Sequence, residues 1–299
     1  MLRTRPMDGR VARRSGGPLV NRWAALTVPV LVFLLVCFLV PLVIMSARSI
    51  TDLPAGAEDP LTNFRRFFGQ EANLRVLGNT FWIAAVSSIA CLLIGYPYAY
   101  LMTIAPPRVT GLLLIAVLVP FWSSLLVRTY AWQVILRDTG LINETLQGWG
   151  VISQPLDLYQ TTTGVLLGMT QVLLPYMVLP LFTTMARIDP ELTKAAANLG
   201  ASPARAFFRV FFPLSIPGVL AGALLVFVLA LGFYITPALL GSPRDTMISA
   251  FIATRVQQQL DWGLAATMGL VLMALAFLVL LLASRVIRVR DVFGALDTD

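Results

Sequence analysis

WAALTVPVLVFLLVCFLVPLVIM, the stretch from Trp23 to Met45, contains no charged side chain. A helix needs about 20 apolar residues to cross the hydrocarbon core of a bilayer, which is about 30 Å thick. The run is longer than the apolar segment of a signal peptide, which has about 7–15 residues, and no small-x-small cleavage site follows it before Arg48. We therefore interpret it as an uncleaved first membrane helix.

Five further apolar stretches follow, and none shows the period-2 alternation of barrel strands. The sequence thus predicts an all-α integral membrane protein with six transmembrane helices over residues 23–286. A basic tail (1–22) would precede the helices and a second tail (287–299) would follow them. The five further helices are expected around Phe81–Met102, Arg108–Arg128 with a continuation to Ile135, Gly164–Met185, Leu220–Leu231 and Asp261–Arg285.

The composition excludes several classes of protein. Only 12% of the residues are charged and 58% are hydrophobic, whereas a soluble domain has about 25% charged residues. The chain has no histidine, and its two cysteines form no Cys-x-x-Cys pair. The usual ligands for catalytic metals and the usual acid–base residue are therefore missing. We expect no catalytic residue, no metal and no cofactor.

The net charge of +7 is explained by membrane orientation. If both termini lie in the cytoplasm, 14 of the 22 Lys and Arg residues fall on the inner side and 8 on the outer side. Cytoplasmic loops of membrane proteins carry such an excess. The basic charge therefore needs no nucleic acid as a partner, and we expect the lipid bilayer to be the surrounding medium.

One cytoplasmic loop, 186–213, has more internal structure than a simple connector. Asp189 and Pro190 predict the start of a short helix, and Gly200 predicts its end. Ser202-Pro203 predicts the start of a second helix, which we expect to run to Pro213, before the fifth span. Two interpretations stay open, a helix that docks on another protein and an amphipathic helix that lies on lipid headgroups.

The residues of this loop resemble the EAA loop of ABC importer permeases. The resemblance rests on Ala195, Ala196, Gly200, Phe207 and Pro213. It implies that the loop docks on an ATPase subunit and transmits its motion to the spans. The sequence departs from the family at Lys194, where a glutamate is usual, and Glu191 one turn earlier is the possible substitute.

Other stretches narrow the resemblance to permeases of the spermidine/putrescine type. They are Gly95-Tyr96-Pro97-Tyr98-Ala99, the run 119–124 (VPFWSS) with Arg128 and Tyr130, 140–144 (GLINE) and 261–263 (DWG). The resemblance implies a bacterial inner-membrane subunit working with a second permease subunit, two ATPase subunits and a periplasmic solute-binding protein. It also implies import of a polyamine or a related amine. The chain itself lacks a phosphate-binding G-x-x-x-x-G-K-[ST] motif, so ATP hydrolysis is expected on the partners and not here.

The candidates for the translocation path are one arginine and four aromatic residues. An arginine in a membrane span is costly and is a functional candidate by default, but it can also extend its head group to the interface. Aromatic rings can bind a cation or form an interfacial belt. The spans contain no acidic residue, which leaves an anionic or zwitterionic solute as an alternative. These candidates are Trp122, Arg128, Tyr130, Trp132 and Tyr234.

Three other functions are alternatives. An ion-coupled secondary carrier would transport without ATP and usually shows internal symmetry. A membrane enzyme would need a cluster of reactive side chains at one depth, and the sequence shows none. A purely structural membrane subunit is disfavoured only by the docking loop. Separately, the spacing of apolar residues over 248–260 predicts an amphipathic helix on the outer side, which would either meet the binding protein or pack on the bundle.

Overall fold

The computed structural model describes residues 22–296, with side chains described over 27–285. The chain divides into two compact units, Met1–Ala47 and Arg48–Asp299. The first contains most of helix α1 (Arg22–Thr51), whose residues Thr27–Thr51 are long and apolar enough to span a membrane. The first predicted span is therefore confirmed as a helix, although Pro29 and Pro41 lie inside it.

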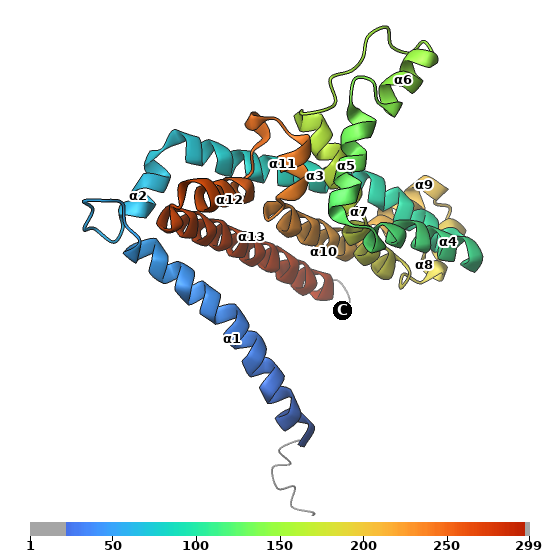
Figure 1. Cartoon of the computed structure of the whole chain (residues 1–299). Helices are drawn as coiled ribbons and strands as arrows, with labels where there is room; N and C mark the ends of the chain where they lie inside the picture. Colours follow the sequence, from blue (N-terminus) through green and yellow to red (C-terminus); the bar gives the residue numbers. More distant parts are fainter. Residues whose placement is uncertain (1–21, 297–299) are drawn as a thin grey trace, which may run out of the picture. The chain divides into compact units, whose positions relative to one another are not determined.

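The second unit consists of helices, and the structure describes no strand between residues 48 and 296 (Figure 1). Its long members are α3 (Glu71–Ile104), α7 (Thr162–Met185), α10 (Phe212–Leu231) and α13 (Trp262–Leu296). The shorter ones are α2 (Thr62–Gly69), α4 (Pro107–Leu118), η1 (Val119–Trp122), α5 (Leu125–Leu136), α6 (Leu141–Gly148), α8 (Pro190–Asn198), α9 (Pro203–Ala206), η2 (Phe207–Phe211), α11 (Ile235–Leu240), η3 (Pro243–Asp245) and α12 (Ile248–Gln259).

The prediction of one continuous third span is wrong. The segments Pro107–Trp122 and Leu125–Gly148 are bent by 101° at a short break, so they form one broken span or a re-entrant loop. Pro120 lies in the 3-10 turn before the break, and Ser123 and Ser124 are extended. Proline removes an i→i−4 hydrogen bond and clashes with the preceding turn, which favours a break at this position. The described chain thus has five helices long and apolar enough to span a membrane, or up to six if the bent pair is one span.

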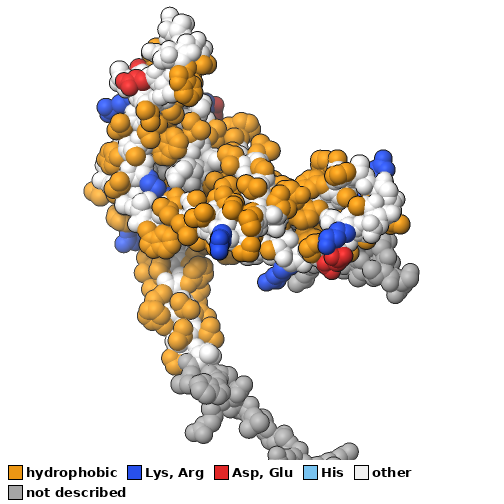
Figure 2. Space-filling view, turned by 90° about the vertical axis from the view of Figure 1, so that its right-hand side faces the viewer, with side chains coloured by type: hydrophobic (Ala, Val, Ile, Leu, Met, Phe, Trp, Pro, Cys, Tyr) orange, Lys and Arg blue, Asp and Glu red, His pale blue; other side chains and the backbone are white. Residues whose placement is uncertain are grey.

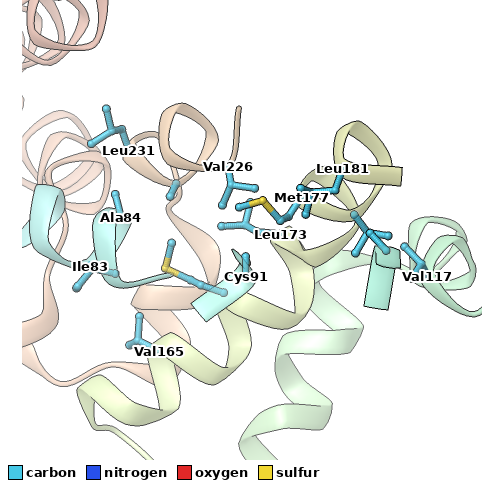
Figure 3. Packing of buried hydrophobic residues seen from close by; sticks show 14 of the residues in the cluster. Ile83, Ala84, Cys91, Val117, Val165, Leu173, Met177, Leu181, Val226 and Leu231 are labelled. Atoms are coloured by element: carbon cyan, nitrogen blue, oxygen red, sulfur yellow. The ribbon is translucent and has the colours of Figure 1, made fainter. Parts of the chain in front are cut away.

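The core of the second unit lies between α3, α7 and α10 (Figure 3). Small residues let these helices approach closely. A Cβ atom on Gly222 of α10 would lie 2.8 Å from Met177 Sδ, and one on Gly218 would lie 2.7 Å from Thr184 Cβ. On α3, a Cβ on Gly95 would lie 3.0 Å from Met177 Cγ. Met177 is fully buried, so α7 is the helix against which the other two pack.

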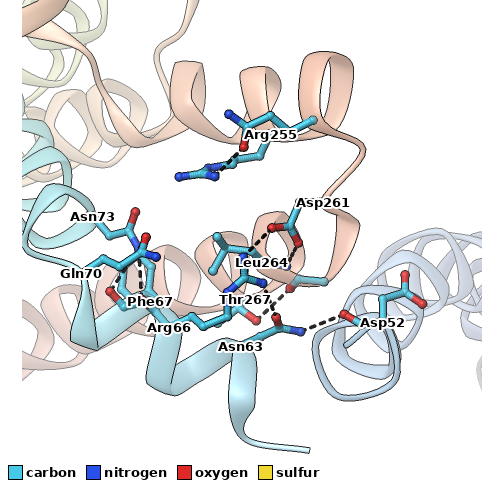
Figure 4. A network of polar contacts seen from close by, with 12 residues as sticks. Asp52, Asn63, Arg66, Phe67, Gln70, Asn73, Arg255, Asp261, Leu264 and Thr267 are labelled. Atoms are coloured by element: carbon cyan, nitrogen blue, oxygen red, sulfur yellow. Dashed lines mark hydrogen bonds and ion pairs between the residues drawn. The ribbon is translucent and has the colours of Figure 1, made fainter. Parts of the chain in front are cut away.

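A polar network joins the loop after α1 to α2 and α13 (Figure 4). Asn63 donates from Nδ2 to the carbonyl oxygens of Ser49 and Asp52, both at 3.0 Å. Arg66 pairs with Asp261 at 3.1 Å, just before α13 begins. The predicted amphipathic helix over 248–260 is confirmed as α12, with Ile248 buried and its glutamines exposed.

The outer surface of the bundle is largely apolar. Figure 2 shows one face on which hydrophobic side chains predominate and charged side chains are few. Leu93, Leu112 and Val127 are among the exposed side chains of α3, α4 and α5. In water such a surface would aggregate, whereas lipid tails accommodate it.

Candidate functional site

The loop after α7 begins with a well-formed helix start. The Asp189 carboxylate accepts a hydrogen bond from the Glu191 N–H at 2.9 Å, and Pro190 occupies the first position of α8. Proline has no N–H to leave unsatisfied there. The acids at Asp189 and Glu191 also complement the positive end of the helix dipole. The predicted start of the first loop helix is confirmed.

Gly200 ends α8 as predicted. Its φ is +84°, a value that favours glycine. The Gly200 N–H donates to the Ala197 carbonyl and the Ala201 N–H to the Ala196 carbonyl, at 2.9 and 3.0 Å. These two bonds form a Schellman motif, which satisfies the last carbonyls of the helix. Leu199, the residue before the turn, is 90% exposed.

The second loop helix does not stop at Pro213, and that prediction is wrong. Ser202 caps α9, which passes through the π-helical turn η2 directly into α10. The Phe212 N–H donates to the Phe207 carbonyl, five residues back. A π turn of this kind already departs from the i→i−4 pattern that a proline interrupts. Pro213 therefore lies in the first turn of α10, and loop and span form one continuous body.

Phe207 fastens this body to α3. Its ring centroid lies 5.3 Å from that of Tyr100 and 6.3 Å from that of Tyr96, both edge to face. Tyr100 also meets Phe211 at 5.1 Å. Such aromatic pairs add to the energy of apolar burial. The body formed by α9, η2 and α10 is thus in direct aromatic contact with α3.

The predicted docking residues share one short helix and the turns that follow it. Ala195 is exposed, Ala196 is half-buried, and Lys194 bonds to Glu191 on the same helix, Nζ to Oε1 at 2.8 Å. This bond raises the pKa of the Lys194 ammonium above its usual value. A cavity of about 690 Å³ separates α8 from the aromatic residues of η2 and α3 and is lined in part by Lys194, Tyr100 and Phe207. Helix α8 thus stands off from the bundle.

A second cavity, of about 340 Å³, lies at the break between η1 and α5. Arg128 lies one turn into α5, where its N–H donates to the Ser124 carbonyl at 3.1 Å. The Nε atom of Arg128 is buried and has no hydrogen-bond partner among the described residues. The cavity is lined by Phe121, Ser123, Leu125, Arg128, Val172, Leu173, Tyr176, Leu229 and Phe233.

The structure does not bring the other path candidates into this cavity. Trp122 is 81% exposed, and Tyr130 and Tyr234 are also exposed. Trp132 is half-buried and packs against the main core. Only Arg128 among the five candidates lines the cavity.

Sequence reasoning missed the residues that surround Arg128, namely Phe121 and Ser123 before the break and Tyr176 in the middle of α7. The available signal was the run Pro120–Ser124, in which a proline and two serines interrupt an apolar stretch. This run indicates a break in the helix, but it does not indicate which other helices line the cavity at the break.

Comparison with known proteins gives three consistent findings. Residues 81–291 match the family model described as "Binding-protein-dependent transport system inner membrane component". The chain is 37% identical over 216 residues to the spermidine/putrescine transport system permease protein PotB of Haemophilus influenzae, covering 71% of this chain and 76% of that protein. It is 36% identical over 215 residues to PotB of Escherichia coli, covering 71% and 78%.

The fold also matches a solved structure. A chain of a bacterial alginate ABC transporter, in complex with an alginate pentasaccharide-bound periplasmic protein, superposes with a TM-score of 0.68. The match covers 88% of this chain and 92% of that one at 18% identity. At this identity the likeness concerns the fold.

Proposed function

Because this chain belongs to the family of inner membrane components of binding-protein-dependent transport systems, we propose that it is the permease subunit of an ATP-driven importer for a small organic amine. The relatives named for spermidine and putrescine support a polyamine or a related amine as the solute. The chain would work with a second permease subunit, two ATPase subunits and a periplasmic binding protein. Both termini would lie in the cytoplasm.

The observation that carries the proposal is the construction of the loop 186–213. Helix α8 is capped at both ends, stands off from the bundle and continues through one glycine turn into α9, η2 and α10. A helix of nine residues is not stable alone. Caps at both of its ends therefore support a functional role for α8. A partner that grips α8 would move α10 directly and α3 through Phe207 and Tyr100.

Energy conversion would take place on the partners, because the chain lacks a phosphate-binding G-x-x-x-x-G-K-[ST] motif. We propose that closure of the ATPase subunits on ATP displaces α8, and that the attached spans then open the path to the other side. The exposed residues Leu192 and Leu199 would provide apolar contact with the ATPase, beside the polar pair Glu191–Lys194.

The test is uptake by proteoliposomes that contain the chain with its second permease, ATPase and binding protein. We expect uptake of radiolabelled amines, with [14C]putrescine and [14C]ornithine as probes, to require ATP and every subunit. The chain alone should neither hydrolyse ATP nor accumulate either amine. Accumulation by the chain alone would identify a secondary carrier instead.

A matched pair of variants tests the loop. Gly200 and Gly56 both have a left-handed φ, +84° and +80°, and a Cβ would meet no atom within 4 Å at either. Valine strongly disfavours this conformation, so Gly200→Val and Gly56→Val impose similar local strain at two places. We expect Gly200→Val to abolish ATP-dependent uptake and Gly56→Val to retain it. Equal uptake in the two variants would refute the coupling role of the α8 turn.

A further inference from the structure

The cavity at the broken helix is lined by the partly buried Arg128, one nitrogen of which has no acceptor among the described residues. Arg128 Nε is buried and unpartnered among the described residues, and none of the cavity-lining residues is acidic. Burying part of a guanidinium without a hydrogen-bond acceptor is unfavourable. This nitrogen therefore has room for an acceptor from outside the part of the chain that the structure describes.

The position of the cavity suits a solute. Val172, Leu173 and Tyr176 place it beside the middle of α7, and Leu229 and Phe233 close it from the end of α10. Binding sites of transporters often lie at this depth, at discontinuous helices. The volume of about 340 Å³ lies within the range of small-molecule pockets.

The backbone at the break adds to the positive potential. Ser123 and Ser124 are extended, and the Ser124 side chain does not cap α5. The first turn of this twelve-residue helix adjoins the cavity through Ser123 and Leu125. The N-terminal end of a helix favours a negative group, as does the guanidinium of Arg128.

The rest of the wall is apolar, and three of its residues are aromatic. The rings of Phe121 and Tyr176 lie 5.2 Å apart, and Phe233 lines the same space. Ring faces attract ammonium groups. One cavity thus offers surfaces for two opposite charges.

We propose, on the premise of the importer function above, that this cavity binds an amine that also carries a carboxylate. Arg128 and the start of α5 receive the carboxylate, and the rings of Phe121, Tyr176 and Phe233 hold the ammonium group. A plain diamine has no group for Arg128, and the two like charges repel each other. The solute class is therefore an amino carboxylate rather than a simple polyamine.

Ornithine and putrescine test this directly, because they differ by one carboxylate. In proteoliposomes with the complete transporter, we expect the wild type to import ornithine in preference to putrescine. Arg128→Gln should lower ornithine uptake by at least about tenfold, the effect of losing one charged hydrogen bond, without lowering putrescine uptake. Arg128→Lys, which keeps the charge, should retain part of the ornithine uptake.

The control is Arg75→Gln, which removes an exposed arginine that pairs with Glu71 and should leave both uptakes unchanged. Co-purification of the partner subunits with Arg128→Gln establishes that the variant is assembled. Equal loss of both uptakes would overturn the proposal, since the guanidinium would then serve an acid of the second permease. So would unchanged uptake, or a wild type that imports putrescine and not ornithine. Absence of ATP-driven uptake of either amine would instead refute the importer function proposed for the wild type.

Discussion

Asn63 is a fully buried amide that ties together three parts of the second unit. Its two bonds to the Ser49 and Asp52 carbonyls hold the loop after α1, and Arg66 donates to its Oδ1 at 3.3 Å. Gly263 at the start of α13 packs against the same loop, because a Cβ at this position would lie 2.0 Å from the Asp52 carbonyl oxygen. Buried polar groups that bond to several backbone atoms fix one arrangement of the chain.

Asn63→Ala should therefore destabilise the protein. The buried Ser49 carbonyl and the partly buried Asp52 carbonyl would each lose a donor, and we expect the free energy of unfolding to fall by about 1–3 kcal/mol. Thermal unfolding of the detergent-solubilised protein measures this change. Gln258→Ala, at an exposed position of α12, is the control and should lie within about 0.5 kcal/mol of the wild type. A midpoint for Asn63→Ala equal to that of the control would contradict this account of the network.

The charge of Lys194 on α8 is expected to affect uptake. Lys194→Glu would place a third acid beside Asp189 and Glu191 at the start of α8, and like charges one turn apart repel. We expect ATP-dependent uptake to fall further in Lys194→Glu than in Lys194→Gln. Equal losses in the two variants would show that only the ammonium group matters.

The pH dependence of the Lys194–Glu191 pair follows from the raised pKa of Lys194. A group whose pKa is raised by folding contributes its stabilisation fully below its usual pKa and loses it as pH rises through the folded value. The contribution of Lys194 should therefore be constant near neutral pH and disappear only above the usual lysine pKa of about 10.4. The ratio of uptake in the wild type to uptake in Lys194→Gln should therefore not change between pH 6 and pH 8.

Helix α10 packs closely against α7. Gly218 lies where Thr184 and the Pro180 carbonyl of α7 leave no space for a side chain. Gly218→Ala should push α10 away from α7 and cost about 1–3 kcal/mol, as overpacking usually does. Gly78→Ala on α3 is matched to it, because its Cβ would meet nothing within 4 Å, and there alanine should stabilise the helix by up to about 1 kcal/mol. Thermal unfolding of the two variants should move in opposite directions, and a shared direction would be inconsistent with close packing at Gly218.

The helices were largely predictable from the sequence, and the exceptions have physical causes. Long uncharged runs fix a membrane helix whatever its neighbours are, which is why α3, α7, α10 and α13 were expected. Proline does not decide the outcome by itself. Pro175 and Pro180 lie inside α7, whereas Pro120 accompanies a break and Pro213 follows a π turn. The difference depends on whether neighbouring helices satisfy the freed backbone groups, which one sequence does not reveal.

Part of the candidate site was likewise predictable from the sequence, and part was not. The caps of α8 are local, so Asp189, Pro190 and Gly200 could be assigned from their spacing. The cavity around Arg128 is built by residues from η1, α5, α7 and α10. Phe121, Tyr176 and Phe233 come together only through tertiary packing. The aromatic candidates Trp122 and Tyr130, predicted because their rings could bind a cation, are instead exposed.

For the whole molecule, the decisive property is the side of the membrane on which each end of the bundle lies. The arginines and the lysine of the loop 186–213 lie after α7, whereas α6 and the loop 149–161 precede it. If α7 crosses the bilayer once, these two regions face opposite compartments. The positive-inside rule predicts that the α8 side lies within the cell.

Labelling with a membrane-impermeant maleimide tests this orientation. Leu199 and Trp149 are 90% and 76% exposed, and either can be replaced by cysteine in a chain whose native Cys37 and Cys91 are changed to alanine. We expect Leu199→Cys to react in inverted membrane vesicles and not in intact spheroplasts. Trp149→Cys should react in spheroplasts and not in inverted vesicles. The parent chain without cysteine supplies the background. The reverse pattern would place α8 outside the cell, away from ATP, and an α8 on that side could not receive the motion of a cytoplasmic ATPase.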